Sequence, residues 1–430
     1  MTAPNGLAAE LTIAAWPGMR PRLLRLEETT EDHATYVRAG GYQDVDDPDA
    51  LLDEVDLGGL LGRGGAAFPM AVKLRAVREA GRSGRDTVVV ANGEEGEPAS
   101  IKDKWLLRNR PHLVLDGVRL AARMVAAARA VVYVSDTSAA QAMTDAIAEA
   151  GDALPPIDVV SVRPGYVAGE ETAAVRAING GPAKPTDKPP RPFECGVDGN
   201  PTLVSNVETL ANLPFLLRHG ADAYRSEGTS ASPGTFLATV TGAGHPAALY
   251  ELPHGVPFTD LLELHGVSPD HVNGVLMGGY FAGLLNRTVL TATLDHETMR
   301  GLGSGLGCGA VALITDNCPV AVAALVMAYF DRENAGQCGS CFNGTAAMSA
   351  VTRALCQGVA TAEDVTRLER WSVQLRGRGA CATLDAATNV AASLLLQFPE
   401  AVAHHLDGVC DACQIDQNSV LRPYEVEAVW

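Results

Sequence analysis

Between residues 87 and 220, short runs rich in β-branched residues alternate with longer stretches of helical periodicity. The runs TVVVAN (87–92), AVVYVSD (130–136) and IDVVSVRPG (157–165) predict strands, and PHLVLDGVRLAARMVAAA (111–128) predicts a helix between the first two. Strands separated by helices generally form a parallel sheet that is covered by helices. The alternation therefore predicts an α/β domain with a mostly parallel sheet.

The rest of the chain differs in character from this alternation. From about 236 to 300, the runs TFLATVTGAG, AALYELP and GVLMGGYFAG predict strands around the short helix FTDLLELHG, a mixture typical of a small α+β module. Beyond residue 318, four amphipathic stretches with short connections predict a four-helix bundle. These stretches are PVAVAALVMAYFDREN, CFNGTAAMSAVTRALCQ, AEDVTRLERWSVQLRG and LDAATNVAASLLLQF.

The charge balance of the chain argues against some classes of partner. Of its 430 residues, 51 are acidic and 33 are basic, which gives a formal net charge of -18. So acidic a surface repels phosphate backbones, and we therefore expect no nucleic acid as a partner. The sequence shows no basic start followed by an apolar run, and no segment with the roughly 20 apolar residues that span a bilayer. We expect a soluble, cytoplasmic protein without direct membrane insertion.

A glycine-rich stretch, GRGGAAFPMAVK (62–73), carries the first functional signal. A backbone without Cβ atoms at Gly62, Gly64 and Gly65 lets a flat ring or a phosphate approach closely, and its amides can bind anionic oxygens. Lys73 adds a positive charge. The pattern predicts a nucleotide-like cofactor, and the alternative is an ordinary tight loop.

Three polar stretches accompany the glycine loop. ANGEEGEPASIKDK (91–104) places acids and an asparagine directly after a predicted buried strand, where the carboxyl edge of a sheet commonly binds ligands. PGYVAGEETAAVRAING (164–180) and PTLVSNVETLANLP (201–214) each place polar side chains at a predicted helix start. An acidic surface turn and ordinary helix capping are the structural alternatives.

Together, these four stretches resemble the flavoprotein subunit of respiratory complex I and its relatives in NAD-dependent formate dehydrogenases and hydrogenases. The motifs of that family read approximately GRGGAGFPTGLKW, NADESEPGTFKDR, YICGEETAL and PTVVNNVETLANVP, and this sequence matches them in order. The resemblance implies that the glycine loop lies against FMN, on which a nicotinamide stacks. The implied FMN-binding residues are Gly62, Arg63, Gly64, Gly65, Lys73, Asn92, Glu94, Glu95, Tyr166, Gly169, Glu170, Glu171, Ser205, Asn206 and Thr209.

Within this implied set, Glu95 and Glu171 are the expected catalytic carboxylates, because acids near the ring can orient hydride transfer and limit solvent access. Two positions depart mildly from the family pattern. Glu94 stands where aspartate is usual, and Ser205 stands where the first asparagine of the NNVET motif is usual.

The resemblance also implies a nicotinamide site formed by Phe68, Glu97, Lys188 and Arg191. Two aromatic positions of the family are changed: Leu74 replaces a tryptophan, and Arg191 replaces the aromatic residue of KPPF. An arginine can stack on an adenine or bind a phosphate. The alternatives are a preference for NADPH over NADH, docking of an acidic partner such as ferredoxin, and an arginine that simply faces solvent.

The cysteines of the predicted bundle depart further from the family pattern. A four-iron cluster usually needs four thiolates, and the resemblance implies Cys338, Cys341 and Cys381 as iron ligands, but Ala335 occupies the position of the first family cysteine. Three alternatives follow: a four-iron cluster (4Fe-4S) with an external or non-cysteine ligand, a three-iron cluster (3Fe-4S), or no cluster. A zinc or redox function is the alternative for a bare C-x-x-C pair.

The remaining cysteines are interpreted as structural. A substitute thiolate could come from Cys308, Cys318 or Cys356, but single cysteines in apolar surroundings are more often small core residues. The C-x-x-C pair Cys410 and Cys413 is expected to belong to a mobile tail, with a disulfide or a partner-bound metal as alternatives. His404 and His405 lie at a predicted helix end, where solvated capping residues are the default.

These inferences predict an enzyme of four parts. They are an FMN- and nicotinamide-binding α/β domain (1–235), a β-grasp-like module (236–312), a helical iron-sulfur domain (313–409) and a tail (410–430). We expect an NAD(P)H oxidoreductase that passes electrons through FMN and a cluster to ferredoxin or a ferredoxin-like subunit. The alternatives are a flavoprotein subunit of a larger complex, ferredoxin-driven flavin chemistry without a nicotinamide, and a non-catalytic paralogue.

Overall fold

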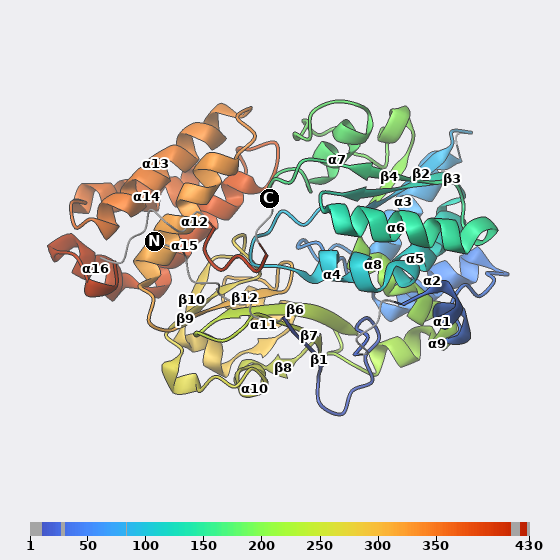
Figure 1. The fold of residues 1–430 in the computed structure, drawn as a ribbon. Helices are drawn as coiled ribbons and strands as arrows, with labels where there is room; N and C mark the ends of the chain where they lie inside the picture. The colour runs from blue at the N-terminus through green and yellow to red at the C-terminus, as the bar shows by residue number, and fades with distance from the viewer. Residues whose placement is uncertain (1–10, 27–30, 83, 414–421, 428–430) are drawn as a thin grey trace, which may run out of the picture.

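The computed structural model describes residues 11–26, 31–82, 84–413 and 422–427. Two sheets and a helical region make up this part of the chain (Figure 1). In the view of Figure 1 the parallel sheet lies to the right, the mixed sheet below it, and the helical region to the left. No helix among the described residues combines the length and apolarity that a membrane crossing requires.

The first sheet is four-stranded, with the order β4-β3-β2-β5, and every neighbouring pair is parallel. Its strands are β2 (Thr87–Asn92), β3 (Ala127–Val134), β4 (Ile157–Ser161) and β5 (Thr202–Asn206). β2 is central and buried from its first to its fifth residue, as a run of valines covered on both faces should be. The predicted parallel sheet is confirmed.

Helices cover both faces and the edges of this sheet, as Figure 1 shows. They are α1 (His33–Arg38), α2 (Pro48–Gly58), α3 (Met70–Gly81), α4 (Lys102–Asn109), α5 (Pro111–Val125), α6 (Thr137–Ala150), α7 (Glu171–Ile178), α8 (Val207–Ala211) and α9 (Leu213–Arg225). Three of them, α4, α7 and α8, begin just beyond the carboxyl ends of strands or of the loops that follow them. Their N-termini therefore gather at one edge of the sheet, where ligands commonly bind.

The second sheet is mixed and six-stranded, with the order β1-β7-β6-β12-β9-β10. Its strands are β1 (Thr12–Ala15), β6 (Thr235–Gly242), β7 (Ala248–Pro253), β9 (Gly274–Met277), β10 (Leu284–Asn286) and β12 (Ala310–Ile314). A small pair, β8 (Val256–Pro257) and β11 (Thr293–Leu294), lies beside the helices α10 (Phe258–Leu264) and α11 (His296–Gly301). β1 pairs in parallel with β7, so a segment from the beginning of the chain belongs to this sheet.

The helical region contains five helices among the described residues, not the four that the periodicity predicts. They are α12 (Pro319–Glu333), α13 (Gly339–Cys356), α14 (Ala362–Gln374), α15 (Thr383–Gln397) and α16 (Pro399–Asp407). The first four match the predicted stretches. α16 was not predicted, because only one residue separates it from α15 and its own sequence carries a short, weak apolar face.

Candidate functional site

The glycine loop forms a closed turn directly before α3. The amide of Gly62 donates to the carbonyl of Phe68 at 2.9 Å, which closes the loop 62–68 at its base. Gly65 has a φ of 114°, where a side chain would be strained, and a Cβ there would meet nothing within 4 Å. A Cβ on Gly64 would crowd a neighbouring asparagine. The loop thus presents bare backbone to open space, which a flat ring or an anion can approach.

Arg63 anchors this loop from beneath. Its amide donates to Thr209 Oγ1 at 2.8 Å, and its guanidinium donates to Tyr224 Oη at 3.1 Å and to Thr235 O at 3.0 Å. The Arg63 side chain is buried, with Glu208 3.8 Å from its Nε. The direct cofactor contact that the resemblance implies for this side chain is therefore replaced by a supporting role.

Charged side chains meet beside the loop. Lys73 Nζ donates to Val204 O at 3.1 Å and lies 3.9 Å from Glu171 Oε2. Glu171 Oε1 lies 3.3 Å from Lys188 Nζ and 4.0 Å from Arg191 Nη1. Burial lowers the pKa of Lys73, which Glu171 opposes and the two other cations reinforce. Three cations around one carboxylate leave positive charge to spare, which suits phosphate or flavin oxygens.

Glu170 caps the helix α7. Its Oε2 accepts the amides of Thr172 at 2.8 Å and Ala173 at 3.0 Å, while its Oε1 accepts Lys188 Nζ at 2.6 Å. Burial lowers the pKa of Lys188, but the hydrogen bond to Glu170 and the nearby acids raise it by more, so that the net shift is upward. Glu170 therefore fixes both the helix start and a lysine of the predicted nicotinamide site.

Asn92 and Glu94 line the same edge of the sheet. Asn92 Nδ2 donates to Gly169 O at 2.7 Å, which ties β2 to the loop before α7. Glu94 is buried, and burial raises its pKa to about 8 although the Gly165 amide and Lys104 favour the ionised form. Its Oε2 has no hydrogen-bond partner among the described residues. A buried oxygen without a partner indicates that a donor from a ligand belongs there.

Glu95 and Glu97, by contrast, point to other parts of the protein. Glu95 caps α4, because its two oxygens accept the amides of Asp103 at 3.2 Å and Lys104 at 3.1 Å. Glu97 Oε2 accepts the Tyr280 amide at 2.9 Å, and burial raises the Glu97 pKa to about 8. The catalytic role of Glu95 stays a prediction, and the structure gives this side chain a capping role.

A buried ionic group beneath the site was not predicted. Lys102 Nζ lies 2.7 Å from Asp103 Oδ1 and 2.9 Å from Glu208 Oε2. Asn206 Nδ2 donates to Asp103 Oδ2 at 2.6 Å, and Glu208 Oε1 accepts the Leu237 amide at 3.0 Å. Burial lowers the pKa of Lys102, but the two acids outweigh it and hold the lysine charged. The group joins the acidic loop, the start of α8 and the second sheet.

Tyr166 lies where the parallel-sheet domain meets the helical region. Its ring packs edge to face on Phe330 and Tyr329 of α12, with centroids 5.2 Å and 5.7 Å away. Tyr329 Oη in turn donates to Gly96 O at 3.1 Å. Ser205, at the end of β5, is buried and points toward Met70, with 3.7 Å between its Oγ and the sulfur. Tyr166 is therefore placed at the boundary, and Ser205 inside the core.

The three cysteines predicted as iron ligands converge at one end of the helical region. Cys338 is the N-cap of α13 and Cys381 precedes α15. The amide of Ala380 donates to Cys338 Sγ at 3.4 Å, and Cys381 Sγ lies 3.4 Å from Thr383 Oγ1. Burial and then the proximity of Cys381 and Cys338 raise the pKa of Cys341 to about 12. The sequence-distant cysteine is thus brought beside the C-x-x-C pair.

Ala335 lies on the loop between α12 and α13, which is tied to the parallel-sheet domain. Lys184 Nζ donates to Ala335 O at 2.7 Å. Gln337 Nε2 donates to Pro185 O at 2.8 Å, and Arg176 donates to Gln337 Oε1 at 3.1 Å. The loop therefore keeps a defined position although its alanine side chain cannot bind iron.

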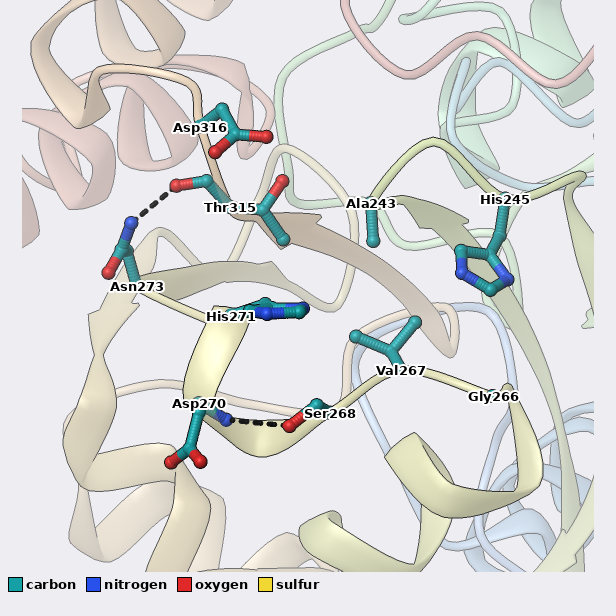
Figure 2. Close-up of a pocket in the computed structure, with 10 residues that line it drawn as sticks. All are labelled: Ala243, His245, Gly266, Val267, Ser268, Asp270, His271, Asn273, Thr315 and Asp316. Atoms are coloured by element: carbon teal, nitrogen blue, oxygen red, sulfur yellow. Dashed lines mark hydrogen bonds between the residues drawn. The ribbon is translucent and has the colours of Figure 1, made fainter.

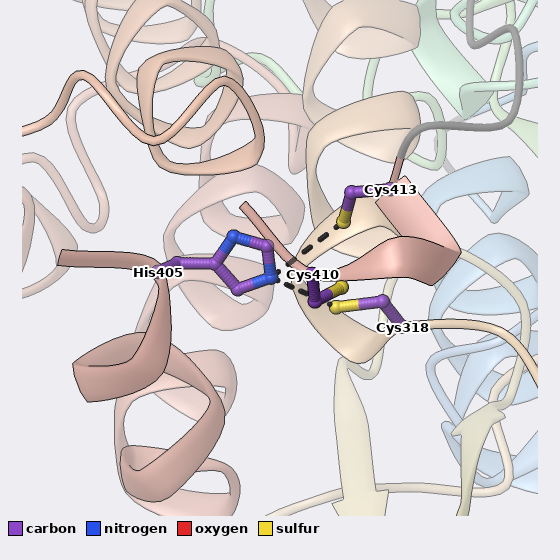
Figure 3. Close-up of side chains that lie close together, drawn as sticks. All are labelled: Cys318, His405, Cys410 and Cys413. Atoms are coloured by element: carbon purple, nitrogen blue, oxygen red, sulfur yellow. Dashed lines mark hydrogen bonds between the residues drawn. The ribbon is translucent and has the colours of Figure 1, made fainter. Parts of the chain in front are cut away.

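A second group of cysteines corrects the interpretation of the tail. Cys318, His405, Cys410 and Cys413 place their ligand atoms within 4.8 Å of one another (Figure 3). Cys413 and His405 are buried, and His405 is only 1% exposed. Cys413 is therefore not on a mobile tail, and His405 is not a solvated capping residue. The sequence signal was the C-x-x-C pair, but 87 residues separate Cys318 from His405.

A hollow in the second sheet's module lies apart from all of these residues (Figure 2). Its lining combines histidines, aspartates and small residues: Ala243, His245, Gly266, Val267, Ser268, Asp270, His271, Asn273, Thr315 and Asp316. Asn273 is held to the Thr315 carbonyl and the Asp270 amide to Ser268, so part of the polar lining is already used within the protein. None of the predicted site residues lies here.

Two family models match the chain. A model described as the Nuo51 FMN-binding domain matches residues 55–215. A model described as the iron-sulfur binding region of NADH-ubiquinone oxidoreductase-F matches residues 321–405. The first match contains the glycine loop and the charged side chains around it, and the second contains Cys338, Cys341 and Cys381.

Full-length relatives give the same picture. The chain is 32% identical over 411 residues to one of the F-type subunits of NADH-quinone oxidoreductase, number 2, in Rhizobium meliloti (strain 1021), covering 89% of this chain and 97% of that protein. It is 32% identical over 370 residues to the mitochondrial NADH dehydrogenase (ubiquinone) flavoprotein 1 of Dictyostelium discoideum, with 81% and 77% covered.

Solved structures extend the similarity to hydrogenases. The fold is similar to a chain of an NAD+-reducing NiFe hydrogenase in the H2-reduced state, with a TM-score of 0.76 and 30% identity. The match covers 84% of this chain and 63% of the hydrogenase chain. The air-oxidised state of such a hydrogenase gives a TM-score of 0.77 at 29% identity, with 89% and 68% covered.

Proposed function

Because the chain belongs to the family of flavoprotein subunits of NADH-quinone oxidoreductases, which bind FMN and a four-iron cluster and use NADH, we propose that it is the NADH-oxidising subunit of a larger complex. It is an oxidoreductase of this family. Its sequence alone led us to expect a separate ferredoxin reductase. The comparisons favour the alternative, a subunit of a complex I-type or hydrogenase-type assembly, because its relatives include named subunits of such an enzyme.

The observation that carries the proposal is the meeting of bare glycine backbone, lysine charge and a buried partnerless oxygen at one edge of the parallel sheet. Gly64 and Gly65 leave space for a ring, and Lys73 lies at the end of the loop. The Oε2 of Glu94 lacks a donor that a ligand can supply. These residues fit FMN, which when bound can take up electrons in a pair and give them up singly.

The chain's own residues then have distinct tasks. Lys73 and the loop amides bind anionic oxygens of the cofactor. Glu171 holds Lys188 and Arg191 near the cofactor face, where they can bind the phosphates of a dinucleotide. Phe68 is 46% exposed on the loop and offers an aromatic face to a nicotinamide or adenine ring. The preference between NADH and NADPH depends on Arg191, and we propose NADH.

Electrons are proposed to leave toward the cysteines at the end of α13. Tyr166 and its aromatic neighbours separate the acidic loop from this end of the helical region and exclude water from the boundary. Cys338, Cys341 and Cys381 supply three thiolates, and the Ala380 amide donates to one of them, an interaction that tunes cluster potentials. The next carrier is proposed to be a ferredoxin-like subunit of the same complex.

The fourth ligand of the cluster does not come from Cys318 or Cys356. α12 has 15 residues and α13 has 18, so each helix is more than about 20 Å long at 1.5 Å per residue. Each of these cysteines lies at the far end of its helix from Cys338. We therefore propose a four-iron cluster whose fourth iron has a non-cysteine ligand.

Ala335→Cys tests this assignment. The added thiolate should bind the fourth iron and slow the loss of iron from the protein in air, measured as iron and sulfide per chain over time. Ala354→Cys, on α13 away from the cluster end, is the control. An unchanged rate of iron loss in Ala335→Cys, or a wild-type cluster that already resists air, would argue against a non-cysteine ligand.

We also propose the domain division that the sequence predicts: an FMN-binding part (1–235), a β-grasp-like module (236–312), an iron-sulfur domain (313–409) and a following segment (410–430). The six-stranded sheet with its packed helix α10 supports the second of these parts, to which β1 adds an edge strand. A cytoplasmic location completes the proposal.

The function is tested by anaerobic mixing of the FMN-loaded protein with NADH. We expect rapid loss of the oxidised-flavin absorption with NADH and a slower loss with NADPH. Bleaching by neither nucleotide would contradict NADH oxidation and would favour ferredoxin-driven chemistry or a non-catalytic paralogue. Faster bleaching with NADPH would instead assign Arg191 to the phosphate that distinguishes the two nucleotides.

A further inference from the structure

We propose that a zinc ion, bound at one end of the helical region, fastens the segment that follows α16 to α12. Its four ligands are Cys318, His405, Cys410 and Cys413. Figure 3 shows these side chains pointing toward one another from three places in the chain: the residue before α12, the last turn of α16, and the short turn after α16.

The spacing of the ligand atoms suits a single tetrahedral ion. Cys318 Sγ lies 3.2 Å from His405 Nε2, and Cys413 Sγ lies 3.6 Å from the same nitrogen. Zinc bonds of about 2.3 Å to sulfur and about 2.0–2.1 Å to nitrogen place tetrahedral S and N ligands roughly 3.6 Å apart. The observed distances require only a small change on metal binding.

The orientation of His405 is fixed for metal binding. Its Nδ1 lies 3.0 Å from the carbonyl oxygen of Leu355, so Nδ1 carries the proton and donates it there. Nε2 is then the acceptor nitrogen, and its lone pair faces the three sulfur atoms. Metal-binding histidines are held in this way, with the second ring nitrogen bonded to a backbone carbonyl or a carboxylate.

The chemistry of the set selects zinc. Three cysteines and one histidine form a closed site of the kind that structural zinc ions occupy, with ligand spacing C-x-x-C in one pair. A site whose ligand atoms all lie within 4.8 Å of one another holds one ion, whereas the thiolates around a four-iron cluster are separated by the cluster itself. Soft thiolates also disfavour magnesium and calcium.

The site is separate from the cysteines assigned to the iron-sulfur cluster. Cys318 begins α12, while Cys338 follows the far end of α12, and the 15 residues of that helix separate them by about 20 Å. No electron needs to pass through a closed zinc site, so its role is structural. It joins elements of the bundle that the cluster does not reach.

The segment so fastened lies between two parts of the molecule. Beyond Cys413, the described residues 422–427 contact the parallel-sheet domain: the Val426 amide donates to Pro98 O at 3.1 Å, and Arg108 pairs with Glu427 at 2.9 Å. The Tyr280 hydroxyl donates to Pro423 O. The zinc ion therefore holds one end of a connection whose other end contacts the FMN-binding part.

The test compares metal contents of the full-length protein and matched variants, purified anaerobically. Wild type should carry one zinc per chain in addition to iron. Cys413→Ser and His405→Gln should lose zinc while retaining iron and FMN. Cys381→Ser is the reciprocal control, because it should lose iron and retain zinc. Element analysis and flavin absorption measure all three.

Several outcomes would overturn the proposal. One is loss of iron, with zinc unchanged, in Cys413→Ser. Another is a wild-type protein that holds no zinc, takes up none from added zinc chloride, and contains a Cys410–Cys413 disulfide by mass spectrometry. Because the variants could misfold, cobalt exchange into wild type provides an independent readout: intense thiolate-cobalt absorption supports the site, and its absence contradicts it.

The structural role has its own measurement. Removal of zinc from wild type by a chelator should increase amide hydrogen exchange in residues 422–427, with no matching increase in β2. The same increase is expected in His405→Gln without a chelator. Unchanged exchange in that segment, once zinc loss is verified, would refute the fastening role.

Discussion

Lys73 lies where burial and charge oppose each other. Burial disfavours its ammonium, and Glu171 at 3.9 Å favours it, so the cation is poised for an anionic ligand. Removing a charged hydrogen-bond donor costs about 1.5–3 kcal/mol of binding, which is roughly a 10- to 100-fold loss of affinity. Lys73→Ala should therefore weaken FMN binding by this factor, measured by flavin titration.

Arg75→Ala is the matched control, because Arg75 lies on the same helix but pairs with Asp56 on the outer face. This variant should bind FMN as wild type does. Equal FMN affinity in Lys73→Ala and Arg75→Ala would show that the loop does not bind the cofactor as proposed.

Glu94 makes the stability of the protein depend on pH. Its pKa of about 8 in the folded protein exceeds the ordinary 4.5, because burial penalises the ionised form. Between these two values the unfolded chain binds fewer protons than the folded one, so stability falls as pH rises from about 4.5 to about 8. Glu94→Gln removes this contribution.

The variant should therefore gain stability relative to wild type across that window, by an amount on the order of a few kcal/mol, since one pKa unit is about 1.4 kcal/mol. Thermal unfolding at a series of pH values measures the difference. The exposed Glu79→Gln is the control. Parallel pH profiles for wild type and Glu94→Gln would contradict a protonated Glu94.

At the scale of the element, the crossing of α5 and α8 positions the site. A Cβ on Gly117 of α5 would lie 2.1 Å from the Leu210 carbonyl oxygen of α8, so only glycine permits this contact. α8 begins just after its N-cap Asn206 and carries Thr209, which holds the glycine loop. Gly117→Ala should cost about 3 kcal/mol or more of folding free energy and weaken FMN binding.

Gly301→Ala is the comparison, because a Cβ on this helical glycine would meet nothing within 4 Å. Its unfolding free energy should change by at most about 1 kcal/mol. Urea denaturation of both variants measures the effect. Similar stabilities for the two would show that the α5–α8 contact can relax without cost.

The elements that periodicity predicted were those with long, regular patterns. β2 and α5 were predicted with nearly their observed bounds, because continuous valines and a helical apolar stripe are strong local signals. β1 and β12 were not predicted, since four or five residues show no period and their place is fixed by partners in the distant strands β7 and β6. Likewise, the helix expected to follow the 201–206 stretch begins only at Val207, because the residues before it pair with β2.

At the scale of the whole molecule, the same distinction applies to the site. Motifs that are contiguous in sequence, such as the glycine loop, identified the residues that meet at the sheet edge. The ion pair of Lys102 with Glu208 and the contact of Cys318 with His405 were not predicted, because each joins residues about a hundred positions apart. No local spacing marks such pairs, and only the fold brings them together.

The three parts of the molecule meet around the proposed electron path. Tyr329 of α12 donates to Gly96 of the acidic loop, and Glu97 accepts the Tyr280 amide from the second sheet's module. Gln337 and Lys184 join the cysteine loop to the parallel-sheet domain. These contacts hold the cofactor edge and the cluster end in a fixed relation, as transfer between them requires.

The most direct test of the account follows electrons from NADH to the cluster in anaerobically purified protein, by flavin absorption and low-temperature EPR on one sample. Wild type should show flavin bleaching and the signal of a reduced iron-sulfur cluster after NADH is added. Cys381→Ser should bleach without that signal, whereas Cys195→Ser, at an exposed position, should behave as wild type. A wild-type protein that contains FMN but no reducible cluster would contradict the proposed electron path.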